Sequence, residues 1–112
     1  MNIIIKATNI ELTDSIKNYI EKKIRLLEKF LKKYELKSNL IFNVEIAKIT
    51  KHHHKGDIFY TEINLKLPNK LLRVEEYDQD LYQSIDLTKD RLKEQILKFK
   101  EINQKNKKIK ND

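Results

Sequence analysis

The sequence has no cysteine and no tryptophan, and it has only one glycine and one proline among 112 residues. Without cysteine there are no disulfides, thiolate metal sites or cysteine nucleophiles. A single glycine excludes a glycine-rich phosphate loop and a Gly-x-Ser-x-Gly nucleophile elbow. No apolar run is long enough to cross a bilayer, and residues 1–7 lack the features of a secretory signal. We therefore expect a cytoplasmic protein that is not an enzyme and uses no cofactor.

Positive charge, in contrast, is abundant. The chain has 24 Lys and Arg against 17 Asp and Glu, a formal net charge of +7. Such an excess favours a polyanionic partner, because each phosphate that is neutralised releases condensed counterions. The alternative is that much of this charge only solvates helix surfaces. The length is that of one domain with a single core.

Four segments have the composition of β-strands. The β-branched segment 2–8 comes first, and apolar and polar residues then alternate along 40–49, 59–67 and 71–77. The connection 50–57, which holds the only glycine, joins the second and third strands as a hairpin. The sequence thus predicts a four-stranded antiparallel sheet.

Two segments have the apolar spacing of helices. One starts at Thr13, a good N-cap, and its apolar residues recur at intervals of three and four as far as Tyr34. The other follows the cap Asp78 and runs to about Ile102. The order strand, helix, three strands, helix predicts an α+β fold with both helices packed on one face of the sheet. We expect a domain of residues 1–102 and a basic, disordered tail of residues 103–112.

The polar sides of the two predicted helices carry the candidate RNA-binding residues. These are Lys22, Lys23, Arg25, Lys29, Lys33, Arg91, Lys93, Lys98 and Lys100. Lys23 lies at the edge of the apolar stripe, where its stem can pack while the ammonium reaches a ligand. Tyrosines are interleaved with these cations and offer rings for base stacking, although we expect Tyr19 and Tyr34 to border the core. Neither an RNP-like aromatic pair nor a GxxG loop occurs, which favours recognition of RNA by shape and backbone.

The most conspicuous metal candidates are His52, His53 and His54, with Asp57 nearby. Adjacent side chains point in different directions, so three consecutive histidines rarely converge on one ion. We expect a solvated hairpin tip and no metal site.

Carboxylates occur in pairs at Glu75 and Glu76 and at Asp86 and Asp90. Paired carboxylates can perform acid–base chemistry only inside a pocket that perturbs their pKa values. Because cations neighbour them in the sequence, ion pairing explains these carboxylates better, and we predict no catalytic residue.

Several motifs resemble those of a known family. The sequence reads IELTDSIKNYIEKKI at 10–24, LEKF at 27–30, LPNKLLRVEE at 67–76 and DLYQSIDL at 80–87, followed by Arg91-Leu92. In this order and spacing the chain resembles the ribosome hibernation promoting factor family, which includes the ribosome-associated inhibitor Y proteins. The resemblance spans residue 3 to about residue 100.

The resemblance implies a βαβββα fold similar to the double-stranded-RNA-binding domain. It also implies ribosome binding in the decoding channel of the 30S subunit, against 16S rRNA, by a protein that is a monomer off the ribosome. Such a protein inhibits translation in stress or stationary phase by blocking the messenger and transfer RNA sites. Lys23, Lys29, Arg91 and Lys98 stand where basic residues recur in the family, whereas Glu94 stands where relatives commonly carry a cation.

The chain resembles the short class of the family, which lacks the C-terminal module that dimerises ribosomes. Whether it promotes or opposes ribosome dimerisation stays open. Two other functions also stay open. One is a general double-stranded-RNA-binding module that acts outside the ribosome, and the other is a protein-interaction domain that uses the outer face of the sheet.

Overall fold

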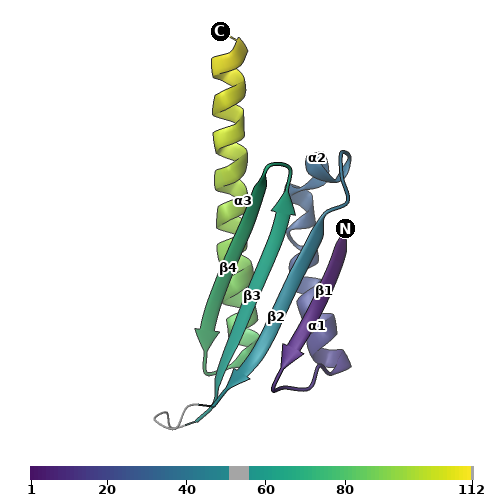
Figure 1. The fold of residues 1–112 in the computed structure, drawn as a ribbon, viewed down its shortest axis with the longest axis vertical. Coiled ribbons are helices and arrows are strands. Elements are labelled where there is room, and N and C mark those ends of the chain that lie inside the picture. Colours follow the sequence, from purple (N-terminus) through teal and green to yellow (C-terminus); the bar gives the residue numbers. More distant parts are fainter. Residues whose placement is uncertain (51–55, 112) are drawn as a thin grey trace.

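The computed structural model describes residues 1–50 and 56–111, with side chains described as far as Lys105. Figure 1 shows its helices and strands. In chain order they are β1 (Asn2–Thr8), α1 (Asp14–Arg25), the 3-10 helix η1 (Glu28–Phe30), α2 (Lys32–Glu35), β2 (Ile41–Ile49), β3 (Ile58–Leu67), β4 (Lys70–Asp78) and α3 (Leu81–Asn111). The predicted α+β fold with the order βαβββα is confirmed.

The four strands form one sheet in the order β1-β2-β3-β4. The pairs β2–β3 and β3–β4 are antiparallel, but β1 pairs with β2 in parallel. The prediction of a wholly antiparallel sheet was therefore wrong for its first strand. The helical segment between β1 and β2 returns the chain to the end of the sheet where β1 began, so the two strands run in the same direction (Figure 1).

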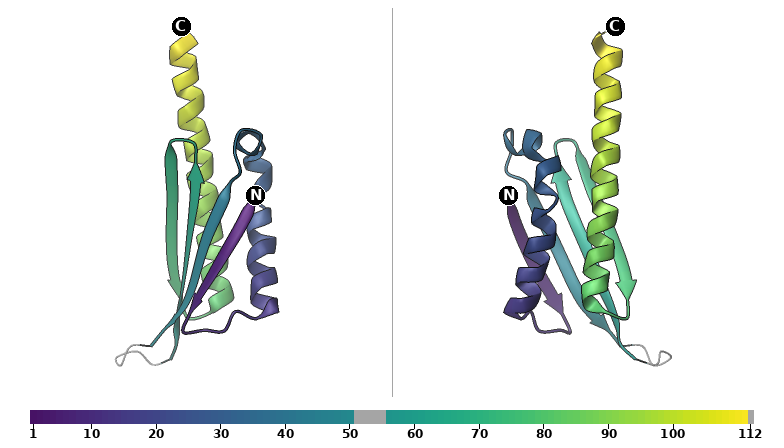
Figure 2. Two further views of the ribbon diagram at one scale, coloured as in Figure 1. Left: turned by 45° about the vertical axis from the view of Figure 1, so that its right-hand side comes forward. Right: turned by 180° about the vertical axis from the view of Figure 1, so that it is seen from behind.

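Both helices cover the same face of the sheet, as Figure 2 shows in its right-hand view. The core lies between the two layers and consists of aliphatic side chains with the aromatic rings of Phe42 and Tyr34. Its fully buried members include Ile20, Ile24, Leu27, Leu31, Phe42, Ile46, Ile63, Leu65, Ile85, Leu92 and Ile96. The opposite face of the sheet is left to solvent.

The first helical segment differs from its prediction. The hydroxyl of Thr13 accepts a hydrogen bond from the amide of Ile16 at 3.2 Å, which confirms the predicted N-cap. The segment is not one continuous helix, however, because it breaks after Arg25 into η1 and α2. Backbone bonds there run from residue i to i−3, as from Leu27 to Ile24 and from Phe30 to Leu27. Apolar residues spaced by three share one side of such a tighter helix, which keeps this stretch against the core.

Helix α3 also differs from its prediction at both ends. Its first turn is capped by Asp80, which accepts the amide hydrogen of Tyr82 at 2.9 Å, whereas the sequence favoured Asp78. The helix continues beyond Ile102, the predicted end, as far as Asn111. No glycine or proline interrupts this lysine- and glutamine-containing stretch, and neither lysine nor glutamine opposes a helix. The division into residues 1–102 and a tail stays a prediction.

Three buried hydroxyl groups fix α3 on the sheet. Thr61 of β3 and Ser84 of α3 share a hydrogen bond of 2.7 Å between their hydroxyl oxygens. Thr88, one turn later, donates to the carbonyl of Ser84 at 2.6 Å and lies 3.3 Å from the carbonyl of Thr61. Because each buried hydroxyl has a partner, the polar contact sets the position of α3 without leaving an unsatisfied group.

Candidate RNA-binding surface

Three of the predicted RNA-binding lysines gather around one aromatic ring between the two helices. The ammonium nitrogens of Lys29, Lys93 and Lys100 lie 5.2, 5.4 and 6.0 Å from the ring centre of Phe30. Phe30 is half-buried and packs against the core, so the ring is held in place. The face of an aromatic ring attracts cations, which reduces the mutual repulsion of the three ammonium groups. We call Lys29, Lys93 and Lys100 the Phe30 lysine cluster.

The cluster continues into a cavity of about 310 Å³ at the end of the helix layer. Lys32 and Lys33 line this cavity together with Lys29 and Lys100. Among the described residues, none of these lysines pairs with a carboxylate within 4.0 Å. Unpaired cations held close together create a positive potential that suits phosphate oxygens.

Lys23 is placed differently, because its charge is shared inside the protein. Its ammonium lies 5.3 Å from the ring centre of Tyr19 and 3.5 Å from a carboxylate oxygen of Asp86. The hydroxyl of Tyr19 donates to the same carboxylate oxygen at 2.7 Å. Burial, together with this hydrogen bond, raises the pKa of Tyr19 from 10.0 to about 12. Asp86 thus links α1 to α3 and takes up part of the charge of Lys23.

Arg91 also lies outside the Phe30 lysine cluster. Its guanidinium donates to the carboxylate of Glu76 at 2.9 Å and to the backbone carbonyl of Glu75 at 3.2 Å, both on β4. The side chain is half exposed and holds α3 against the edge strand of the sheet. Glu76 and Asp86 therefore form ion pairs as expected, and Asp90 pairs with Lys89, whereas the carboxylate of Glu75 instead accepts a hydrogen bond from Tyr60.

The remaining predicted cations are exposed. Lys22 and Arg25 lie three residues apart on α1, and neighbours at that spacing share a side of a helix. Lys33 and Lys98 line a second, larger groove, to which Lys37 and Lys70 also contribute. Lys37 and Lys70 were not among the predicted residues, which all lie on the predicted helices, since Lys37 follows α2 and Lys70 opens β4. The signal for Lys70 was its place after Pro68-Asn69, the turn that joins β3 to β4.

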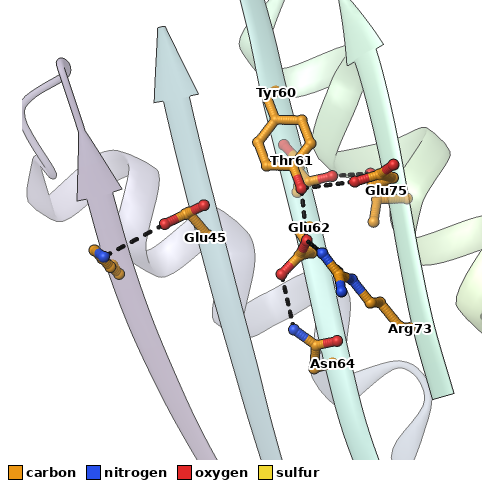
Figure 3. Close-up of polar contacts among 9 residues, drawn as sticks. Glu45, Tyr60, Thr61, Glu62, Asn64, Arg73 and Glu75 are labelled. Atoms are coloured by element: carbon orange, nitrogen blue, oxygen red, sulfur yellow. Dashed lines mark hydrogen bonds and ion pairs between the residues drawn. The ribbon is translucent and has the colours of Figure 1, made fainter. Parts of the chain in front are cut away.

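The outer face of the sheet has a different electrostatic character (Figure 3). The hydroxyl of Tyr60 lies 2.6 Å from a carboxylate oxygen of Glu62 and 2.8 Å from one of Glu75. Glu62 also accepts hydrogen bonds from Arg73 at 2.8 Å and from Asn64 at 2.9 Å. Burial and these two carboxylates raise the pKa of Tyr60 far above its usual value. Because carboxylates neutralise the cations here, this face is a poorer partner for phosphate than the helix side.

Glu62 makes this network sensitive to pH. The hydrogen bonds from Tyr60, Asn64 and Arg73 lower the pKa of Glu62 below its ordinary value of 4.5. A carboxylate with a lowered pKa stabilises the fold above its unfolded pKa and loses this effect as the pH falls through the folded pKa. We expect Glu62→Gln to reduce the free energy of unfolding at pH 7 by about 1–2 kcal/mol. The difference from the wild type should shrink below about pH 4, as measured by urea unfolding; a constant difference down to pH 2.5 would contradict it.

The part of the chain that the structure describes contains neither a metal-binding cluster nor a membrane-spanning helix. Across residues 1–50 and 56–111 there is no group of three or more His, Asp or Glu side chains that could hold a metal ion. His52, His53 and His54 lie outside the described residues. No described helix combines the length and the apolar character needed to cross a membrane.

Comparison with known proteins gives one family. The family model described as "Sigma 54 modulation protein / S30EA ribosomal protein" matches residues 3–104. The ribosome hibernation promotion factor of Staphylococcus aureus (strain COL) is 35% identical over 102 residues, which cover 90% of this chain and 50% of that protein. That of Lactococcus lactis subsp. cremoris (strain MG1363) is 34% identical over 97 residues, or 86% of this chain and 48% of the relative. The chain therefore spans about half the length of these relatives.

Solved structures agree with this match. The N-terminal domain of Thermus thermophilus Protein Y is 34% identical and superimposes with a TM-score of 0.70, covering 88% of this chain and 99% of that domain. A ribosomal subunit interface protein from Coxiella burnetii has a TM-score of 0.66 at 19% identity, covering 89% and 98% of the two chains, and this likeness concerns the fold alone.

Proposed function

Because this chain belongs to the sigma 54 modulation protein / S30EA ribosomal protein family, we propose that it is a ribosome hibernation factor that binds the small subunit and inhibits translation. Family membership confirms the resemblance that the sequence motifs indicated. The proposed partner is 16S rRNA in the decoding channel of the 30S subunit, in the cytoplasm of stressed or stationary cells. The chain acts there as a monomer and blocks the sites of messenger and transfer RNA, without any chemical step.

The observation that carries this proposal is the Phe30 lysine cluster. Three ammonium groups from η1 and α3 meet on one ring, and five further predicted cations (Lys22, Lys23, Arg25, Lys33 and Lys98) lie on the same helix layer. A rigid array of cations is suited to the fixed spacing of phosphates in folded RNA, which is recognised largely by shape and backbone. Inhibition then follows from occupancy, because RNA bound by the protein is no longer accessible to other ligands.

Cosedimentation with purified 30S subunits tests the proposal. If six or more cations contact phosphates, affinity should fall at least about 1,000-fold between about 50 and 200 mM salt. Excess messenger and initiator transfer RNA should displace the protein, because the proposed sites overlap. Binding to a free RNA duplex as tight as to subunits would instead indicate a general RNA-binding module. Subunits that ignore the protein at low salt would overturn the proposed function.

A further inference from the structure

A groove of about 730 Å³ lies where α2, the β3–β4 turn and α3 meet. In Figure 1 this turn is at the upper end of the sheet, between α2 and α3. The volume is within the range of roughly 300–1,000 Å³ that is typical of small-molecule sites. The Phe30 lysine cluster lies outside this groove, since none of its three lysines lines it. The groove adjoins the smaller cavity beside that cluster, with which it shares Lys33, Tyr34 and Asn103.

The rim of the groove is cationic. Lys33, Lys37, Lys70 and Lys98 line it from three parts of the chain, and no lining residue is Asp or Glu. Within the described residues, none of these four lysines pairs with a carboxylate within 4.0 Å. This rim is therefore suited to an anion with more than one charged group.

The floor of the groove is apolar and aromatic. Phe99 is partly exposed on this floor, whereas Leu72 and Tyr34, whose ring centre lies 5.7 Å from that of Phe99, are buried. Ile102 forms part of the wall and is 48% exposed, although it is a large apolar residue. A phosphate alone gains nothing from such a floor, whereas a flat nucleobase stacks on aromatic and aliphatic surface.

Amide side chains complete the lining. Asn69, Gln95 and Asn103 line the groove, and none of them makes a side-chain hydrogen bond to another described residue. A primary amide carries both donors and an acceptor, which is the complement of a base edge. Asn69 has a φ of 63°, so the turn holds it in the left-handed region that asparagine tolerates better than most residues.

We propose that this groove receives one unpaired nucleotide of the bound RNA, with the base against Phe99 and Ile102 and the flanking phosphates on the lysine rim. The inference rests on the proposed function and deepens it, because it adds recognition of a single-stranded position to recognition of the backbone. A regular duplex keeps its bases stacked inside the helix and cannot place one in a recess, so only an unpaired nucleotide uses the floor.

Three RNA hairpins test the inference: one fully paired, one with a single bulged adenosine, and one with an abasic site at the bulge. Fluorescence anisotropy at constant salt gives the dissociation constant of each. The wild type should bind the bulged adenosine about tenfold more tightly than the abasic bulge, which is the effect expected from stacking one base. Asn69→Gly with Ile102→Ser should reduce this ratio to about twofold, since glycine keeps the positive φ while the amide and the apolar wall are removed.

Matched substitutions elsewhere provide the control. Asn9 has a φ of 59° and Leu97 is 41% exposed on α3, and neither lines the groove. Asn9→Gly with Leu97→Ser should keep the tenfold ratio. Equal binding of the wild type to the adenosine and abasic bulges would overturn the inference, and so would a tenfold ratio that persists in the groove variant.

Two further measurements separate related explanations. A polyglutamate peptide that displaces the bulged hairpin from the wild type but not from the groove variant would assign the groove to an acidic protein segment and overturn the inference. Subunit binding is measured in parallel. If the protein binds 30S subunits but does not prefer the bulged adenosine, only the inference about the groove is refuted. If the protein does not bind the subunits, the proposed function is refuted.

Discussion

Reversing the charges of Lys29 and Lys93 together is expected to weaken binding to the small ribosomal subunit on the order of 100-fold at physiological salt. Both ammonium groups lie within 5.4 Å of the Phe30 ring centre, on different helical segments. A single RNA surface facing the seam between these segments would lose two phosphate contacts and meet two carboxylates instead. The slope of log affinity against log salt should fall by about two, as cosedimentation at several salt concentrations measures.

The matched control reverses two lysines on the outer face of the sheet. Lys6→Glu with Lys66→Glu changes the net charge by the same amount, but both residues are exposed on the side away from the helices. We expect the control to weaken binding less than about fivefold, through the change in net charge alone. If the two double variants were equally impaired, net charge and not the Phe30 lysine cluster would account for binding.

Replacing Phe42 by alanine is expected to lower the free energy of unfolding by about 3–5 kcal/mol. Phe42 is fully buried in β2, and its neighbours in the sheet are Ile3 and Leu65. Removing the ring leaves a cavity that the stiff sheet and the hydroxyl-anchored α3 cannot close. Since domains of this size are stable by only about 5–15 kcal/mol, the melting temperature should fall on the order of 10–20 °C.

Phe42→Leu is the companion variant, because it keeps most of the volume and should cost about 1 kcal/mol. At temperatures where both variants remain folded, their affinity for subunits should equal that of the wild type, because Phe42 contacts no solvent. A loss of stability below 1 kcal/mol for Phe42→Ala would show that the core is not centred on this ring. Weaker binding by the folded variants would show that the scaffold alters the cation array.

The fold was predictable wherever the information is local. β-Branched composition located β1, alternation of apolar and polar residues located the other three strands, and Thr13 marked the first helix start correctly. The parallel pairing of β1 with β2 was missed, because strand direction depends on where the connecting helix returns the chain. The break after Arg25 was missed as well, since a spacing of three fits both an α-helix and a 3-10 turn over so short a stretch.

The candidate site was predictable by residue type but not by arrangement. Helical periodicity selected Lys29, Lys93 and Lys100 as exposed cations, yet only the packing of η1 against α3 brings them to one ring. The pairing of Lys23 with Asp86 joins residues 63 positions apart in the chain (86 minus 23), which no local pattern records. Lys37 and Lys70 were missed for the same reason, because the groove exists only after the sheet has folded.

The contrast between the two faces of the molecule affects how it approaches RNA. The outer face of the sheet carries as many cations as carboxylates, namely Lys6, Lys66 and Arg73 against Glu45, Glu62 and Glu75, whereas excess positive charge lies on the helix side. The protein is consequently an electric dipole, and the field of a polyanion exerts a torque on it before contact. Diffusing molecules then arrive with their helices leading, so a larger share of collisions is productive and the association rate constant declines as ionic strength rises.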